Sequence, residues 1–278
     1  MRPNLALQRF QAGQPIVNAW LSMPGSYTAE VVARQGYHAV TVDLQHGMMD
    51  FETAMTMLQA ISTTDATPLV RCPAVDGPQV MRLLDAGAYG VICPQVDSPA
   101  LAQRFVQACR YPPAGTRSFG PARGVLYGGA DYFDHANSHV LALAMIESQQ
   151  ALDALDAILD TPGLDGIYVG PNDLALSLGQ RPGAELQGPV ADAIDRILAA
   201  ALERGLLAGI FCADAAIARH RLAQGFHLVT PGNDAAILAQ GCKARFHDTL
   251  APQHASEPPV PIKAVIPAVG QAVRESGY

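Results

Sequence analysis

The sequence predicts an α/β fold in which one chain closes into a single (β/α)₈ TIM barrel. Short apolar and β-branched runs alternate with longer amphipathic stretches, which is the pattern of parallel strands joined by crossover helices. There are eight such runs, and 278 residues is an ordinary length for one barrel of eight units. A composition of 49% hydrophobic and 15% charged residues is consistent with a large two-layer core.

The eight predicted strands are spaced along most of the chain. We expect them at Pro15–Leu21, Ala39–Asp43, Pro68–Arg71, Gly90–Pro94, Val140–Ile146, Gly166–Val169, Ala208–Cys212 and His227–Thr230. Several are almost continuously hydrophobic, as strands buried on both faces are. Helical patterns fill the intervals, at Phe51–Ile61, Gln79–Ala86, Ala100–Cys109, Ala151–Leu159, Val190–Arg204 and Ala215–Ala223. Glycines that can end a helix in the left-handed conformation follow helical stretches, at Gly36, Gly87, Gly205 and Gly225.

Two segments do not follow the alternation. Tyr111–Asn137 is long and rich in glycine, proline and arginine, and loops of this length in a compact domain are usually functional. The proline-rich end predicts a boundary between a catalytic barrel, residues 1–250, and a helical or extended tail, residues 251–278, that is a candidate for packing on a neighbouring subunit. A doubly wound open sheet is the alternative fold, but no GxGxxG follows the first strand.

Composition and charge exclude several classes of partner. A net charge of −7 gives no basic face for nucleic acid. The beginning of the sequence lacks the apolar segment of a signal peptide, and no stretch approaches the roughly 18 apolar residues of a membrane span. The five cysteines include no CxxC pair, which favours free thiols in a reducing compartment. We therefore expect a cytoplasmic protein that binds neither nucleic acid nor membrane.

Ionisable residues gather where the predicted strands end. Barrel enzymes carry their catalytic groups at this rim. Asp43 and His46 end the second strand, Arg71 the third and Glu147 the fifth, and Asp173 follows the sixth. Each has an ordinary alternative: a helix cap for Asp173, a surface position for the histidine, and a rim salt bridge for Arg71. Five such groups at one rim of a weakly charged chain nevertheless favour an active site.

These residue types suit metal-assisted carbanion chemistry. Two carboxylates, Glu147 and Asp173, are ligands that Mg²⁺ or Mn²⁺ accepts, and open coordination positions could take the carboxylate and keto oxygens of a 2-oxo acid. An arginine can stabilise the oxyanion and a histidine can move protons. The lysines of the chain are Lys243 and Lys263, far from every predicted strand end, so a Schiff base is not expected.

Six short segments carry a resemblance to a known family. They are 43–47 (DLQHG), 70–73 (VRCP), 84–88 (LDAGA), 111–118 (YPPAGTRS), 146–148 (IES) and 170–174 (GPNDL). In order and spacing they resemble the metal-dependent 2-oxo acid aldolases of the HpcH/HpaI family, which includes 4-hydroxy-2-oxoheptanedioate and 2-dehydro-3-deoxyglucarate aldolases. The similarity extends from about Trp20 to about Pro231, most of the chain.

The resemblance implies a class II aldolase that reversibly cleaves 4-hydroxy-2-oxo acids to pyruvate and an aldehyde. It implies that His46 is the base, that Asp85 raises the basicity of that histidine, and that Arg71 stabilises the transition state. Helical periodicity alone would place Asp85 on a solvated helix face. Glu147 and Asp173 would bind Mg²⁺ or Mn²⁺, with Co²⁺ and Zn²⁺ as further candidates. Family members are typically homohexamers, trimers of dimers with an exchanged C-terminal helix.

The same resemblance implies a set of substrate contacts: Gln45, Met145, Gly170, Pro171, Asn172 and Asp173. Backbone amides at 170–173 would hold the pyruvate carboxylate. Met145 stands where the family usually has glutamine, and Asn172 stands where a small residue is common, so the acceptor aldehyde is the part of the reaction most affected. Arg123 is a candidate for binding a carboxylate at the far end of the aldehyde, or equally for a salt bridge between subunits.

Two other functions fit parts of the pattern. A thioester lyase, like the β subunit of citrate lyase or a malyl-thioester lyase, would share the barrel and the metal carboxylates. The sequence has no basic cluster suited to coenzyme A. A subunit that binds 2-oxo acids without turnover is the second alternative, and Met145 is the feature that points to it.

Overall fold

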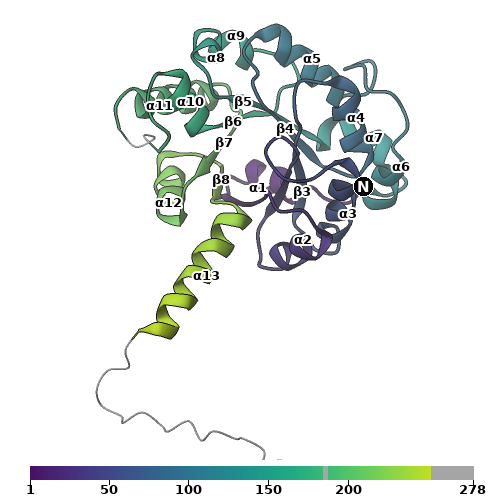
Figure 1. Cartoon of the computed structure of the whole chain (residues 1–278). Coiled ribbons are helices and arrows are strands. Elements are labelled where there is room, and N and C mark those ends of the chain that lie inside the picture. The colour runs from purple at the N-terminus through teal and green to yellow at the C-terminus, as the bar shows by residue number, and fades with distance from the viewer. Residues whose placement is uncertain (184–186, 252–278) are drawn as a thin grey trace, which may run out of the picture. The chain divides into compact units, whose positions relative to one another are not determined.

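The computed structural model describes residues 1–183 and 187–251, and its centre is a closed barrel of eight parallel strands (Figure 1). The strands are β1 (Ile16–Leu21), β2 (Ala39–Asp43), β3 (Thr67–Arg71), β4 (Gly90–Cys93), β5 (Leu141–Ile146), β6 (Gly166–Val169), β7 (Leu207–Cys212) and β8 (Leu228–Pro231). Each matches a predicted strand to within one residue at either end. The pairing of β1 with β8 closes the sheet, so the TIM barrel is confirmed and the open-sheet alternative is wrong.

Helices surround the strands of the barrel (Figure 1). Within the described residues the helices of the chain are α1 (Leu5–Gln11), α2 (Ser26–Ala33), α3 (Phe51–Ile61), α4 (Gly77–Asp85), α5 (Pro99–Cys109), α6 (Ala122–Gly128), α7 (Tyr132–His139), α8 (Gln149–Asp153), α9 (Leu155–Leu159), α10 (Pro171–Ser177), α11 (Gly188–Glu203), α12 (Ala215–Gln224) and α13 (Asp234–Leu250), of which α2 to α12 lie around the barrel. The helix expected at 151–159 is two short helices that meet at Ala154. The long segment 111–137 contains α6 and α7, which the sequence did not predict.

Side-chain caps explain where several helices begin. Asp50, Ser98, Ser148 and Asp214 each precede a helix and accept a hydrogen bond from a backbone N–H of its first turn. At the other end of α12, Gly225 has a φ of 112°, a left-handed conformation that glycine adopts without steric cost. These local signals are why the predicted boundaries of the helices agree closely with the observed ones.

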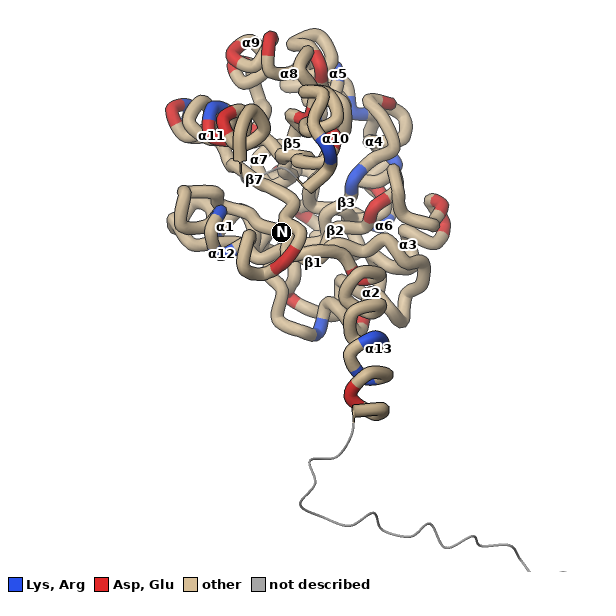
Figure 2. Tube along the Cα trace, turned by 60° about the vertical axis from the view of Figure 1, so that its left-hand side comes forward, with Lys and Arg blue, Asp and Glu red and all other residues tan. Residues whose placement is uncertain are grey.

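The core has two layers. The larger one lies between the strands and the helices, and the smaller one fills the barrel with residues such as Ile16, Leu69 and Ile92, all fully buried. Figure 2 shows the same division by charge, with acidic and basic residues on outer helices such as α11 and few on the strands. The free cysteines fit this division, since Cys72, Cys93, Cys109 and Cys212 are buried and Cys242 is exposed.

Helix α1 closes the end of the barrel where the strands begin. Asn4 caps it by accepting from the N–H of Leu7, and the Asn4 amide donates to the carbonyls of Tyr89 and His139. Ala6 of the helix donates its N–H to the Thr67 hydroxyl and packs with the apolar residues inside the barrel. This end is therefore filled, and an opening for a ligand is expected at the opposite end.

The chain divides into two compact units, Met1–Ala239 and Gln240–Tyr278. The first contains the whole barrel, and the described part of the second is the remainder of α13. The predicted tail at 251–278 lies, apart from its first residue, outside the described residues. Of the helices in 1–183 and 187–251, none combines the length and apolar character needed to cross a bilayer.

Candidate active site

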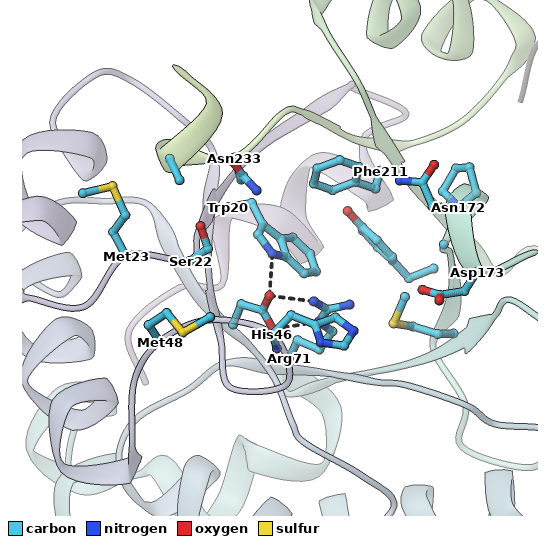
Figure 3. A pocket seen from close by; sticks show the side chains of 16 residues that line it. Trp20, Ser22, Met23, His46, Met48, Arg71, Asn172, Asp173, Phe211 and Asn233 are labelled. Carbon is cyan, nitrogen blue, oxygen red and sulfur yellow. Dashed lines mark hydrogen bonds and ion pairs between the residues drawn. The ribbon is translucent and has the colours of Figure 1, made fainter. Parts of the chain in front are cut away.

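A cavity of about 480 Å³ opens at the C-terminal ends of the strands (Figure 3). Residues from seven of the eight strands or the segments that follow them line it: Trp20, Ser22, Met23, Asp43, His46, Met48, Arg71, Met145, Tyr168, Gly170, Pro171, Asn172, Asp173, Phe211, Asn233 and Ala235. It therefore brings together His46, Arg71 and Asp173, which are far apart in the sequence. This is the end of the barrel at which we predicted an active site from the sequence.

Asp43 is the centre of the polar side of the cavity. Its Oδ1 accepts from Nε of Arg71 at 2.8 Å and from the backbone N–H groups of Gln45 and His46 at 3.0 and 3.2 Å. Its Oδ2 accepts from Nη2 of Arg71 at 2.6 Å and from the indole N–H of Trp20 at 3.1 Å. One carboxylate therefore orients the guanidinium of Arg71 and shapes the loop that carries His46.

The charge state of Asp43 follows from these bonds. Burial by itself would raise the pKa of Asp43, since the carboxylate is only 2% exposed. The hydrogen bonds and positive charge of Arg71, together with the bonds from Trp20 and His46, outweigh burial and hold that pKa below its ordinary value. Asp43 is thus a permanent anion near neutral pH, suited to fixing a cation rather than to exchanging protons.

Glu147 lies at the end of β5 and is 4% exposed. Its Oε1 accepts from the backbone N–H of Gln95 at 2.8 Å, and Gln95 has a φ of 53°, unusual for a residue with a side chain. Its Oε2 is buried with no hydrogen-bond partner among the described residues. Burial first, and then the negative charge of Asp173, raise the pKa of Glu147 to about 7.

The chain turns beside this carboxylate at Gly170. A Cβ at that position would lie 2.4 Å from Oε2 of Glu147 and 3.0 Å from Cε of Met145, so a side chain there would displace the glutamate. Gly170 is also the N-cap of α10, and Pro171 occupies the first turn. Asp173 stands in that turn and is exposed to the cavity, so the alternative that Asp173 caps the helix is wrong.

Glu147 and Asp173 have the properties of a site for a divalent cation. A buried oxygen without a partner on one carboxylate and an exposed second carboxylate nearby are what a hard cation with oxygen ligands requires. No group of three or more His, Cys, Asp or Glu side chains in the described part of the chain could hold a metal. The remaining positions around a cation would thus be left to water or to a substrate.

The other side of the cavity is apolar. Met145 is 2% exposed and lies beside Gly170. The family resemblance implies glutamine at position 145. Trp20 stacks on Tyr168 with ring centroids 5.4 Å apart and meets the edge of Phe211 at 5.8 Å. This wall offers an apolar surface to whatever lies next to the carboxylates.

Asp85 is not brought to the cavity. It is the last residue of α4, and its carboxylate accepts from Nη2 of Arg117 at 2.7 Å. Burial raises the pKa of Asp85 despite that partner. Among the described residues there is no bond between Asp85 and His46, so the expected pairing of these two residues stays a prediction. The alternative that Asp85 is a solvated helix residue is wrong, because its carboxylate is paired with the buried Arg117.

Arg123 and Gln45 also lie away from the cavity lining. The Arg123 guanidinium donates to the carbonyl of Ala86 at 2.7 Å and to the Ser62 hydroxyl at 2.9 Å, on the outer side of the barrel. The expected contact with a distal carboxylate therefore has no support within this chain. The side-chain Oε1 of Gln45 is buried and has no hydrogen-bond partner in the described part of the chain. A direct contact of Gln45 with substrate stays a prediction.

Sequence reasoning assigned no role to several residues of the site. Asp43 was recognised at a strand end but not as the partner of Arg71. Trp20 and Phe211 are the last residues but one of β1 and β7, close to the barrel rim, but a lone aromatic residue near a strand end is more often part of the core. Asn233 comes from the loop after β8, which no motif marked.

Comparison with known proteins agrees with this geometry. The family model for HpcH/HpaI aldolase/citrate lyase matches residues 17–240. The chain belongs to this family. A hydroxypyruvate/pyruvate aldolase of Rhizorhabdus wittichii is 42% identical over 240 residues, which cover 86% of this chain and 96% of the relative. A 4-hydroxy-2-oxo-heptane-1,7-dioate aldolase of Salmonella dublin is 36% identical over 84% of this chain and 90% of the relative.

A solved structure is similar over nearly the same region. The crystal structure of an HpcH/HpaI aldolase/citrate lyase family protein from Burkholderia cenocepacia has a TM-score of 0.83 and 32% identity, and covers 88% of this chain and 98% of its own. The prediction of an aldolase, a carbon–carbon lyase that cleaves 2-oxo acids to pyruvate, is confirmed by the family and these relatives.

Proposed function

We propose that this chain is a divalent-metal-dependent aldolase that reversibly cleaves 4-hydroxy-2-oxo acids into pyruvate and an aldehyde. The observation that carries the proposal is the buried Oε2 of Glu147, which has no hydrogen-bond partner among the described residues and lies next to Gly170. Gly170 lines the cavity that also contains Asp173, Arg71 and His46. Names of relatives support the substrate class, since they refer to pyruvate, hydroxypyruvate and a 4-hydroxy-2-oxo diacid.

Glu147 and Asp173 would hold the cation, with Mg²⁺ or Mn²⁺ favoured because both ligands are carboxylates. A divalent cation supplies Lewis-acid polarisation of the 2-oxo group and stabilises the negative charge that develops on its oxygen. Co²⁺ and Zn²⁺ are the further candidates. The carboxylate of the 2-oxo acid would lie near the start of α10, at Gly170–Asp173, where Met145 and Asn172 border it.

The chain's own residues then carry the proton and charge movements. His46 takes the proton from the C4 hydroxyl, and the electrons of that O–H bond form the aldehyde carbonyl. The C3–C4 bond breaks, and its electron pair becomes the enolate of pyruvate. Arg71, fixed by Asp43, donates to the enolate oxygen and so lowers the free energy of that state. A proton delivered to C3 completes the formation of pyruvate.

The direct test is exchange of the methyl protons of pyruvate in D₂O, followed by NMR, before and after removal of metal with EDTA. We expect exchange with Mg²⁺ or Mn²⁺, loss after chelation, and recovery on adding back the cation. Full exchange after exhaustive chelation would contradict the metal site. A screen of aldehydes with pyruvate and hydroxypyruvate under Mg²⁺, Mn²⁺, Co²⁺ and Zn²⁺ would then identify the acceptor.

Assembly into a homo-oligomer, a hexamer as the resemblance implies, is part of the same proposal. Large apolar side chains stand on the surface of the barrel unit, among them Leu126 at 85% exposed, Tyr27 at 78% and Phe119 at 70%. Side chains of this kind are common in contacts between subunits. Light scattering of the purified protein gives the mass directly, and a monomer would contradict this part.

A further inference from the structure

Trp20 is the only tryptophan of the chain, and it stands between the reacting groups and the interior of the barrel. It lies near the end of β1, is 4% exposed and lines the cavity. Neither the proposed metal ligands nor the proposed base depend on it directly. Its contacts nevertheless involve both partners of the ion pair between Asp43 and Arg71 (Figure 3).

These contacts form a closed set of three. The indole N–H donates to Oδ2 of Asp43 at 3.1 Å, and the guanidinium carbon of Arg71 lies 4.9 Å from the centroid of the indole ring. Arg71 in turn donates to both oxygens of Asp43. Because Nε and Nη2 are both bonded to the carboxylate, the plane of the guanidinium is set by Asp43, and its lateral position is limited by the ring of Trp20.

The ring of Trp20 is itself held from inside the barrel. It stacks on Tyr168 at 5.4 Å with an interplanar angle of 30°. The Tyr168 hydroxyl donates to Oγ1 of Thr230 at 2.7 Å, and that oxygen also accepts from Nδ2 of Asn18 at 2.9 Å. Oδ1 of Asn18 accepts from the Thr41 hydroxyl at 3.0 Å.

All four of these polar residues are 0% exposed, and they come from β1, β2, β6 and β8. A polar network in a barrel core is rigid where each side chain is hydrogen-bonded to another, because rotation of one leaves a buried group without a partner. The orientation of Tyr168, and through it that of Trp20, is therefore determined by hydrogen bonds that cross the barrel. An apolar ring of similar size in place of the tyrosine would lack that restraint.

We propose that Trp20 is a positioning residue that transmits this rigidity to Arg71. The N–H of Trp20 holds Asp43 and its ring limits the guanidinium, so that Arg71 presents its remaining donors to the 2-oxo acid in one orientation. This inference rests on the proposed function for the identity of the ligand, but the coupling of Trp20 to Arg71 stands on the geometry alone. Trp20 acts through Arg71 rather than on the reacting atoms.

The test is a double-mutant cycle on pyruvate binding in the presence of Mg²⁺, measured by calorimetry with Trp20→Phe, Arg71→Ala and the double variant. Phenylalanine keeps an aromatic ring but removes the N–H. We expect Trp20→Phe alone to weaken pyruvate binding about 10-fold, the effect of one hydrogen bond to a charged group. In the Arg71→Ala background the same substitution should change binding less than about 2-fold. The proposal would be wrong if the changes in pyruvate binding free energy of the two single variants added up to that of the double variant.

Tyr89→Phe is the matched control. Tyr89 is also fully buried and its hydroxyl also makes one hydrogen bond, to the carbonyl of Arg2 at 3.1 Å, but at the closed end of the barrel. We expect this variant to lower the melting temperature and to leave pyruvate affinity unchanged. A loss of affinity in Tyr89→Phe equal to that in Trp20→Phe would show a general effect of core hydrogen bonds and would contradict a specific role for Trp20.

A second measurement remains informative if Trp20→Phe does not fold. As the only tryptophan, Trp20 alone provides the indole emission of the native chain. We expect pyruvate with Mg²⁺ to change the intensity or wavelength of that emission, and Arg71→Ala to remove most of the change. An emission change of equal size in Arg71→Ala would contradict coupling through Arg71. Pyruvate binding with a non-additive cycle but without aldolase turnover would refute the proposed function and leave the positioning role intact.

Discussion

The two ends of the barrel contain the same types of charged residue but differ in how completely those residues are hydrogen-bonded. Each has a buried arginine paired with an aspartate: Arg71 with Asp43 where the strands end, and Arg110 with the partly exposed Asp165 where they begin. At the closed end the Arg110 guanidinium also donates to the carbonyls of Val140 and Gly163. At the open end Arg71 keeps donors directed into a cavity of about 480 Å³.

The difference extends to the carboxylates. The closed end binds its polar groups to one another, as Asp165 does by accepting from Arg110 and from the N–H of Ala142. The open end leaves Oε2 of Glu147 buried and unpartnered, at a cost in stability. Completed hydrogen bonding thus marks the structural end of this barrel, and incomplete hydrogen bonding marks the end where a ligand completes the site.

Exchanging each carboxylate for its amide tests this comparison and has the largest expected effect. Glu147→Gln removes a ligand of the proposed cation, and we expect pyruvate proton exchange to fall about 1000-fold or more, equivalent to about 4 kcal/mol. The same change removes a buried negative charge whose Oε2 has no partner among the described residues, so the metal-free melting temperature should rise. NMR exchange and calorimetric melting measure the two effects.

Asp165→Asn is the counterpart at the closed end. It leaves Arg110 buried without its anion, so the melting temperature should fall, while exchange activity per folded molecule stays within about 2-fold. If Asp165→Asn reduced activity as severely as Glu147→Gln, the functional contrast between the two ends would be wrong.

The two arginines allow a similar comparison. Arg71→Lys keeps the positive charge but loses the bidentate hydrogen bonding in which Nε and Nη2 donate to the two oxygens of Asp43. We expect turnover to fall about 100-fold, with the free energy of unfolding little changed. Arg110→Lys should instead lower the free energy of unfolding by about 3 kcal/mol and leave turnover unaffected. Steady-state kinetics and denaturant unfolding separate the outcomes, and loss of turnover in both variants would contradict the division.

The pKa of Glu147, raised to about 7 by burial, makes cation binding depend on pH. The cation needs the ionised carboxylate, so its affinity should fall about tenfold per pH unit below 7 and level off above it. Without metal, the free energy of unfolding changes with pH in the opposite direction. Because the folded state favours protonated Glu147, this free energy declines as pH rises from 4.5 through 7. Calorimetric titrations of Mn²⁺ at pH 6, 7 and 8 check the first statement. A flat profile would contradict the proposed ligand.

The smallest expected effect is at the closed end. His227 precedes β8, and its Nδ1 accepts from the N–H of Ala208 at 3.0 Å. Burial lowers the pKa of His227 below 6.5, so the folded state favours the neutral ring, and stability should decline as pH falls below 6.5. We expect a loss of about 1 kcal/mol or less, from one hydrogen bond. His227→Asn, which accepts but does not titrate, should reduce the slope of stability against pH in this range.

Much of the fold and part of the site could be predicted from the sequence. Strand positions follow from local hydrophobicity, and helix starts from caps such as Asp50 and Ser98, because both depend on neighbours within a few residues. The helix α1 was missed, since its seven residues have little periodicity and its stability comes from packing inside the barrel. The split of 151–159 into two helices at Ala154 has no sequence signal that we recognise.

By itself the sequence determined the eight parallel strands and the presence of Arg71, Glu147 and Asp173 at their ends, because short hydrophobic runs separated by amphipathic stretches are local properties. Only the tertiary structure decided which of these groups meet. Arg71 forms its ion pair with Asp43 and not with a proposed metal ligand, and Asp85 forms its ion pair with Arg117. Trp20 contacts the polar network inside the barrel through Tyr168 and donates a hydrogen bond to Asp43 in the site. The physical reason is that ion pairs and ring contacts form between residues tens of positions apart, whose distance is set by closure of the barrel and by no local pattern.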